Sequence, residues 1–167
     1  MRARVWKDKL IVNTIAEGPF AGKWVTNGHL MIRCPLVDRL KGCENLSRLA
    51  VGKKYGGSDW IDDDLPDLTM ITRLVEDKEK GRLLREVRGV LYGHHKTIVL
   101  ATADAPHWCT TVDAEYADVV RMGETRAVDA KSPVGVWGPS LCAVVMPIRF
   151  DDGQLTWDGA RLTVVPS

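Results

Sequence analysis

Hydrophobic and polar residues alternate, or gather in short apolar runs, along most of this chain, which is the pattern of β-strands packed on a core. Asn27-Gly28 separates two such runs and is a strong signal for a tight hairpin. The pattern therefore predicts an antiparallel sheet. The expected strands are Val5 to Ile15, Lys23 to Thr26, His29 to Cys34, Thr69 to Val75, Arg82 to Tyr92 (which also fits a helical period), Lys96 to Ala103, Trp108 to Val112, Ala127 to Ala130, Gly135 to Trp137 and Leu141 to Phe150.

Two segments depart from this alternation. Between Leu36 and Ala50, apolar residues recur every three or four positions, as on an amphipathic helix. Asp113 is a good N-cap for a second, short helix over Ala114 to Met122, which Gly123 would end. The sequence thus predicts an α+β fold in which two helices pack on antiparallel sheets, with a loop over Lys53 to Pro66.

The end of the chain has its own turn signals. Asp152-Gly153 and Asp158-Gly159 flank an apolar stretch, so we expect an added hairpin from Gln154 to Val165 within a C-terminal extension, residues 151–167. At 167 residues, the whole chain fits one domain of residues 1–167.

Charge, cysteine spacing and hydrophobicity limit the partners and the cellular location that we expect. The net charge of +1 argues against binding to nucleic acid through overall charge. The four cysteines have no C-x-x-C spacing, no secretory signal is visible, and no apolar stretch approaches the ~20 residues that span a membrane. We therefore expect a cytoplasmic protein with free thiols and no membrane partner.

The clusters of acidic residues and histidines lack the spacing of a metal or catalytic site. Asp62-Asp63-Asp64 with Asp59 would suit a divalent cation only if their oxygens converged, and adjacent carboxylates usually point into water. His94-His95 with His107 and Cys109 lacks the paired spacing of zinc ligands. No G-x-S-x-G elbow and no phosphate-binding loop occurs. The sequence predicts no catalytic site, no cofactor and no metal.

One stretch near the C-terminus resembles a known family. Ser132-Pro133-Val134, followed by the run from Cys142 through Val145-Met146-Pro147-Ile148-Arg149, resembles the closing segment of the bacterial DNA sliding clamp, the beta subunit of the replicative polymerase. Upstream, three further segments resemble clamp segments in the same order along the chain. They are Thr111 to Val120, at a strand-into-helix step, Trp24 to His29, in a hairpin, and Asp64 to Leu68, in a Pro-Asp loop.

The resemblance is to the third, C-terminal domain of that clamp, and it implies a non-enzymatic clamp-like protein, such as a phage or mobile element would carry. It implies partners among replication proteins, bound through a short peptide motif, and contact with DNA phosphates without sequence specificity. A homo-oligomer is compatible with the sequence. By position, the peptide-groove residues would be Val145, Met146, Pro147, Ile148 and Arg149. The candidate DNA-facing residues are Arg39, Lys41, Arg48, Lys53 and Lys54.

This chain also departs from the family. It has room for one domain where the family joins three, and it continues to Ser167 where the family ends, so the extension could cover the groove. Arg121 is the one cation of the second predicted helix. Two alternatives follow: a structural or decoy protein that binds a host factor, and a small metal-assisted enzyme that uses the Asp59 to Asp64 loop.

Overall fold

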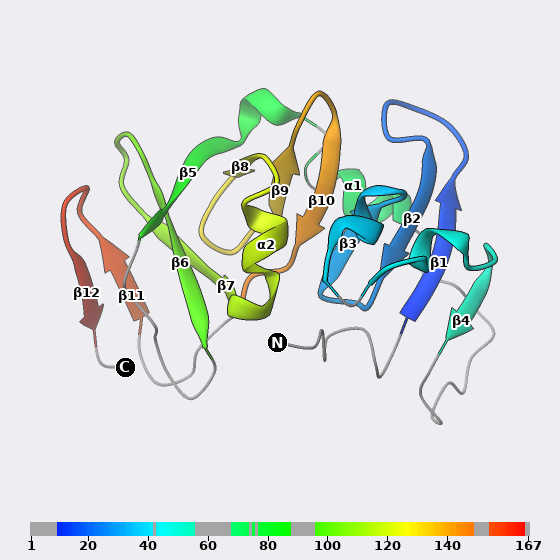
Figure 1. Cartoon of the computed structure of the whole chain (residues 1–167). Helices are drawn as coiled ribbons and strands as arrows, with labels where there is room; N and C mark the ends of the chain where they lie inside the picture. The colour runs from blue at the N-terminus through cyan, green and yellow to red at the C-terminus, as the bar shows by residue number, and fades with distance from the viewer. Residues whose placement is uncertain are drawn as a thin grey trace.

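The structure is a computed structural model, and it describes residues 10–41, 43–55, 68–73, 75, 77–87, 96–148 and 154–165. In this part of the chain, ten strands form one antiparallel sheet and two more form a separate hairpin (Figure 1). The strands of the large sheet are β1 (Leu10–Ile15), β2 (Gly22–Thr26), β3 (Leu30–Arg33), β4 (Lys53–Tyr55), β5 (Arg82–Val87), β6 (Thr97–Thr102), β7 (Cys109–Asp113), β8 (Glu124–Ala127), β9 (Val134–Trp137) and β10 (Leu141–Val145). The hairpin is β11 (Gln154–Trp157) and β12 (Leu162–Val165).

The sheet contains one arrangement of strands twice. Its order is β4-β1-β2-β3-β10-β9-β8-β5-β6-β7. In each half, three consecutive strands form a meander, and a fourth returns beside the first after a helical segment, which is the Greek-key order. β9 and β10 then continue from β8 and pair with β3, so they join the two halves.

Short helices accompany the strands. In the first half, two 3₁₀ turns, η2 (Leu36–Arg39) and η3 (Leu46–Arg48), precede β4. In the second half, η5 (Ala114–Tyr116) runs into α2 (Ala117–Val120) before β8. Between the halves lie α1 (Leu68–Arg73) and η4 (Lys78–Lys80).

Short apolar runs, such as Leu141–Val145 in β10, are buried at every position and give the sheet two apolar faces. On the face toward the viewer in Figure 1, side chains from both halves form one continuous front core, against which both helical segments pack. Its members include Val12, Val25, Ile32, Leu100, Val112, Val136 and Val145 from the strands, and Val37, Cys43, Tyr116, Val119 and Val120 from the helical segments.

The opposite face is covered in two places. Under the first half, α1 packs on a rear core that contains Trp24, Met31 and Trp137. Under the second half, the β11–β12 hairpin packs on Val99, Ala101 and Cys109, and we call this contact the hairpin core. The sheet is therefore the middle layer of the molecule, with packing on both of its faces.

Most strand predictions are confirmed within the described residues, including the Asn27-Gly28 hairpin and the C-terminal hairpin. Arg82–Val87 is a strand, not the alternative helix. The strand predicted over Ala127 to Ala130 lies earlier, at Glu124–Ala127, and the strand from Leu141 ends at Val145. Lys53–Tyr55, predicted as loop, is an edge strand paired with β1. Residues 1–9, 56–67, 88–95 and 149–153 lie outside the described part.

The helix predicted over Leu36 to Ala50 is wrong in its local structure. Instead of one amphipathic helix, the chain makes the two 3₁₀ turns, separated by extended backbone at Leu40 and left-handed backbone at Asn45. Asp38 accepts hydrogen bonds from the N–H and hydroxyl of Ser47, and such side chains compete with helical hydrogen bonding. The apolar residues still pack against the front core, so the period correctly identified the buried face.

Thr69 to Val75 was predicted as a strand, and this is wrong, because residues 68–73 are α1. Leu68, Thr72 and Val75 are buried and Ile71 packs beside them, which is the three-and-four spacing of a helix.

By contrast, the helical segment predicted after Asp113 is confirmed, with its first turn 3₁₀. The Asp113 carboxylate accepts from the N–H of Glu115 at 2.8 Å, as an N-cap does. In the described residues no helix is long and apolar enough to cross a membrane.

A close backbone approach makes Gly123 a sensitive position. A Cβ there would lie 2.3 Å from the carbonyl oxygen of Trp137, in the strand paired with β8. Gly123→Ala should therefore displace main chain and lower the free energy of unfolding by about 1–3 kcal/mol in chemical denaturation. Gly138→Ala is the control, because its Cβ would lie 3.1 Å from the Cys142 sulfur and no closer than 4.0 Å to backbone, at the carbonyl oxygen of Ser140. Equal stability of the two variants would contradict this packing.

Candidate functional site

The segment after β10 is the first candidate surface, and its residues differ in accessibility. Val145 ends β10, is fully buried and belongs to the front core, so it acts as a core residue here. Met146 is 37% exposed, whereas Pro147 and Ile148 are half-buried. Arg149 lies outside the described residues.

Main-chain hydrogen bonds fix this segment at both ends. The N–H of Met146 donates to the carbonyl of His29 at 2.8 Å. The N–H of Ile148 donates to the carbonyl of Thr111 at 2.8 Å, and the Thr111 hydroxyl donates back to the carbonyl of Ile148 at 2.8 Å. Pro147, which has no N–H, lies between the two anchors. The segment thus runs from the β2–β3 turn to edge strand β7 with a fixed backbone.

The turn beside Met146 is equally well held. The Asn27 side-chain oxygen accepts from the N–H groups of His29 and Leu30, at 2.9 and 2.8 Å. The Asn27 amide donates to the hydroxyl of Tyr116 at 3.1 Å, which ties the turn to the second helical segment. Burial raises the pKa of Tyr116, so its hydroxyl stays protonated at neutral pH. The apolar residues 146–148 therefore lie against a rigid polar turn.

The C-terminal hairpin is held elsewhere. Leu155, Trp157 and Leu162 pack on the hairpin core, on the face opposite the helical segments. The indole N–H of Trp157 donates to the carbonyl of Thr102 at 3.2 Å. Figure 1 shows β11 and β12 beside β5 and β6, at the end of the molecule away from β1. The contacts that fix the hairpin are thus made by β6 and β7 rather than by Met146.

The second candidate surface is the cationic segment of the first half. Arg39, Lys41, Arg48 and Lys53 are exposed, and Lys54 is placed in β4 by its backbone. Lys23, which the sequence did not single out, is half-buried, and its ammonium donates to the carbonyls of Ser47 and Leu49. The bonds of Lys23 and the Asp38–Ser47 contact hold together the loop that carries Arg39 and Arg48.

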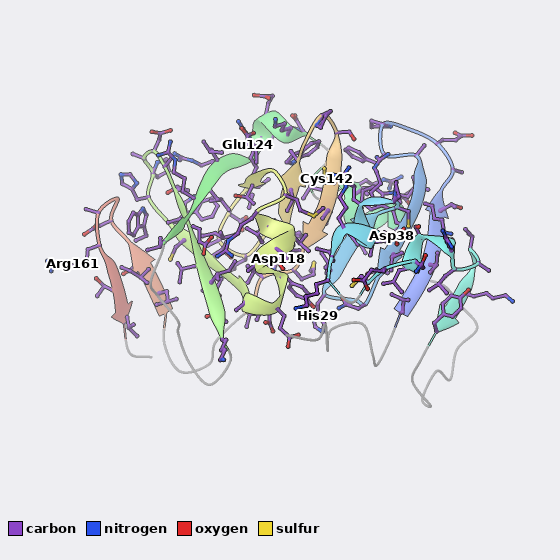
Figure 2. The ribbon with its side chains drawn as sticks, viewed as in Figure 1. His29, Asp38, Asp118, Glu124, Cys142 and Arg161 are labelled. Atoms are coloured by element: carbon purple, nitrogen blue, oxygen red, sulfur yellow. The ribbon has the colours of Figure 1, made fainter. Side chains whose placement is uncertain are left out.

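The second helical segment has the opposite charge. Its exposed or half-buried acidic residues are Asp113, Glu115 and Asp118, and Figure 2 shows Asp118 on α2, on the same side of the sheet as Asp38. Arg121 forms a two-pronged ion pair with Glu86, at 2.7 and 3.0 Å. Residues 36–48 thus carry the cations Arg39, Lys41 and Arg48 against the acids Asp38 and Glu44, whereas the second helical segment carries three acids against Arg121.

Most of the candidate metal ligands lie outside the part of the chain that the structure describes. Asp59, Asp62-Asp63-Asp64 and His94-His95 lie outside the described residues, His107 is exposed, and Cys109 is buried in β7. Among the described residues, no group of three potential ligands converges. The bonds between Thr111 and Ile148 could not be predicted, because hydrogen bonds between distant segments leave no local sequence pattern.

Comparisons with protein-family models, with curated proteins and with solved structures found no match to this chain.

The pKa of Asp38 tests the fold of the cationic loop. The hydroxyl and N–H of Ser47 stabilise the carboxylate and lower the pKa of Asp38. A lowered folded pKa means that this contact contributes stability above the unfolded pKa of about 3.9, and that the stability is lost as pH falls through the folded pKa. In an NMR titration, Ser47→Ala should raise the pKa of Asp38 toward its ordinary value, and Ser47→Thr should not. An unchanged pKa in Ser47→Ala would contradict the contact.

Proposed function

We propose that this protein is a clamp-like, non-enzymatic binding domain of DNA replication. It binds a short peptide of a replication protein at the surface of residues 146–148 and makes weak contacts with DNA phosphates through Arg39, Lys41, Arg48, Lys53 and Lys54. The observation that carries the proposal is the exposed, anchored Met146 beside the Asn27–His29 turn. Both segments belong to the ordered set that resembles the bacterial sliding clamp.

The architecture supports the proposal. The resemblance implies two helices packed on antiparallel sheets, and here two helical segments lie on one face of a continuous antiparallel sheet. Each follows the third strand of a Greek key, so they hold equivalent places in the two halves.

The chemistry of the Met146 segment suits peptide binding. A methionine side chain is flexible and polarizable, so one surface can accept different apolar partners. The backbone beneath Met146 is fixed by the bonds to His29 and Thr111, which lowers the entropic cost of binding. The His29 side chain is also exposed, at the edge of the same surface.

The charge pattern supports DNA contact through the first half alone. Phosphates would be attracted by the exposed cations of the 36–53 segment and repelled by Asp113, Glu115 and Asp118. Only weak binding without sequence specificity is expected from so few contacts. A protein that fails to bind DNA at low salt would instead favour the decoy function, in which the same surface engages a host protein.

The peptide surface is tested by titrating the full-length protein with a labelled clamp-binding peptide in fluorescence anisotropy. Met146→Asp should weaken binding at least about ten-fold, because it places a charge in the centre of an apolar contact. Val128→Asp is the matched control, since Val128 is 48% exposed in the turn after β8. If the unsubstituted protein does not bind, or if both variants bind equally well, the peptide function is wrong.

The DNA surface is tested by measuring affinity for duplex DNA over a range of salt concentrations. Each lost phosphate contact should reduce the slope of log affinity against log salt by about 0.9. Lys41→Ala and Arg48→Ala should each do so, and Lys131→Ala, in the turn between β8 and β9, should not. Tight binding that does not change with salt would refute the electrostatic account.

A further inference from the structure

Strand β12 presents an open apolar edge. It pairs with β11 on one side, and within the described chain no strand pairs with it on the other. Figure 1 shows β12 at the outer end of the molecule. Val164 and Val165 are 44% and 46% exposed. An edge of this kind is a template for pairing with another strand.

The hairpin register determines which backbone groups point outward. The N–H of Asp158 donates to the carbonyl of Arg161 at 3.3 Å, so these two residues form a hydrogen-bonded pair. Pairs alternate along an antiparallel ladder, so Trp157–Leu162 and Leu155–Val164 are the pairs without mutual hydrogen bonds. Leu162 and Val164 therefore direct their N–H and C=O groups away from β11.

The side chains of the same two residues form an apolar rim. Leu162 packs with Leu155 and Trp157 in the hairpin core. Val164 lies two residues further along the strand, hence on the same face, but at the margin where it stays partly exposed. The hairpin core is thus incomplete along β12.

We propose that β12 pairs antiparallel with β12 of a second copy of this chain, about a two-fold axis at Thr163. In this register Leu162 lies opposite Val164 of the second copy. These are the residues with outward backbone groups, so each of the two symmetric pairs exchanges two hydrogen bonds. The result is a continuous sheet β11-β12-β12-β11 across the two copies.

Several features favour a second copy over an unrelated strand. The two-fold arrangement brings Leu162 and Val164 of each copy together and extends the hairpin core across the axis. Thr163 faces its own counterpart, a favourable cross-strand pair. Arg161 lies opposite Val165, so its aliphatic stem covers that side chain while the two arginines stay at opposite ends of the pairing.

The expected complex is a reversible dimer. One pair of short strands buries less surface than a standard stable interface. The dimer should therefore form with rising protein concentration, and the folded monomer should persist at low concentration.

Sedimentation velocity at increasing concentration tests the pairing. Val164→Pro removes the outward N–H without breaking a bond to β11, and Val164→Lys places charges near the axis. Both should shift dimerisation to at least about ten-fold higher concentration, whereas Val164→Thr and Val128→Lys should leave it unchanged. The NMR signal of the Trp157 indole N–H, which donates to the carbonyl of Thr102, checks that the hairpin stays docked in each variant.

A cross-linking experiment tests the register. Opposed residues of a pair without mutual hydrogen bonds have Cα atoms about 4.5 Å apart, within disulfide range. In a Cys34→Ser background, which removes the partly exposed native thiol, Thr163→Cys should form a disulfide-linked dimer on mild oxidation. Val165→Cys, which would face Arg161, should not. The proposal is overturned by a chain that stays monomeric and does not cross-link, and equally by a dimer that Val164→Pro and Val164→Lys leave intact.

Discussion

The pairing of β3 with β10 is the contact on which the rest of the structure depends. It joins Leu30 to Val145 and Ile32 to Ala143, residues from opposite ends of the main sheet's sequence. Through it the two Greek keys become one sheet, and their separate apolar faces become one front core. The same junction brings Met146 to the carbonyl of His29, so the candidate peptide surface exists only because the halves are joined there.

Sequence patterns predicted the strands well because alternation reports directly on which side chains are buried. They also identified the buried face of residues 36–50, although the backbone there is not an α-helix. A period of three or four requires only that the apolar residues reach the core. Two 3₁₀ turns held by Asp38 and Ser47 meet that requirement as well as one helix does. At α1 the prediction of a strand is wrong, because a run this short fits a strand or a helix, and only the burial of Leu68, Ile71 and Thr72 reveals the helical spacing.

The candidate site was less predictable than the fold. Residues 145–148 could be located by resemblance, but their accessibility could not, since Val145 is core and Met146 is exposed one position later. The anchoring of the segment depends on Thr111 and His29, which are far from it in sequence. The repeated Greek key is likewise invisible in the sequence. The two halves share an order of strands and turns, which is set by main-chain pairing, while their side chains have no matching pattern.

The order of strands in the sheet also constrains when the fold can close during synthesis. The first Greek key is complete once β4 has been made, yet β3 keeps an unpaired edge until β10, the last strand of the large sheet, emerges. Closing that gap requires contact between residues more than a hundred positions apart, and such long-range pairing is slow. The nascent first half therefore exposes an apolar strand edge for most of translation, and it is in this interval that the chain is most open to chaperones and to misassembly.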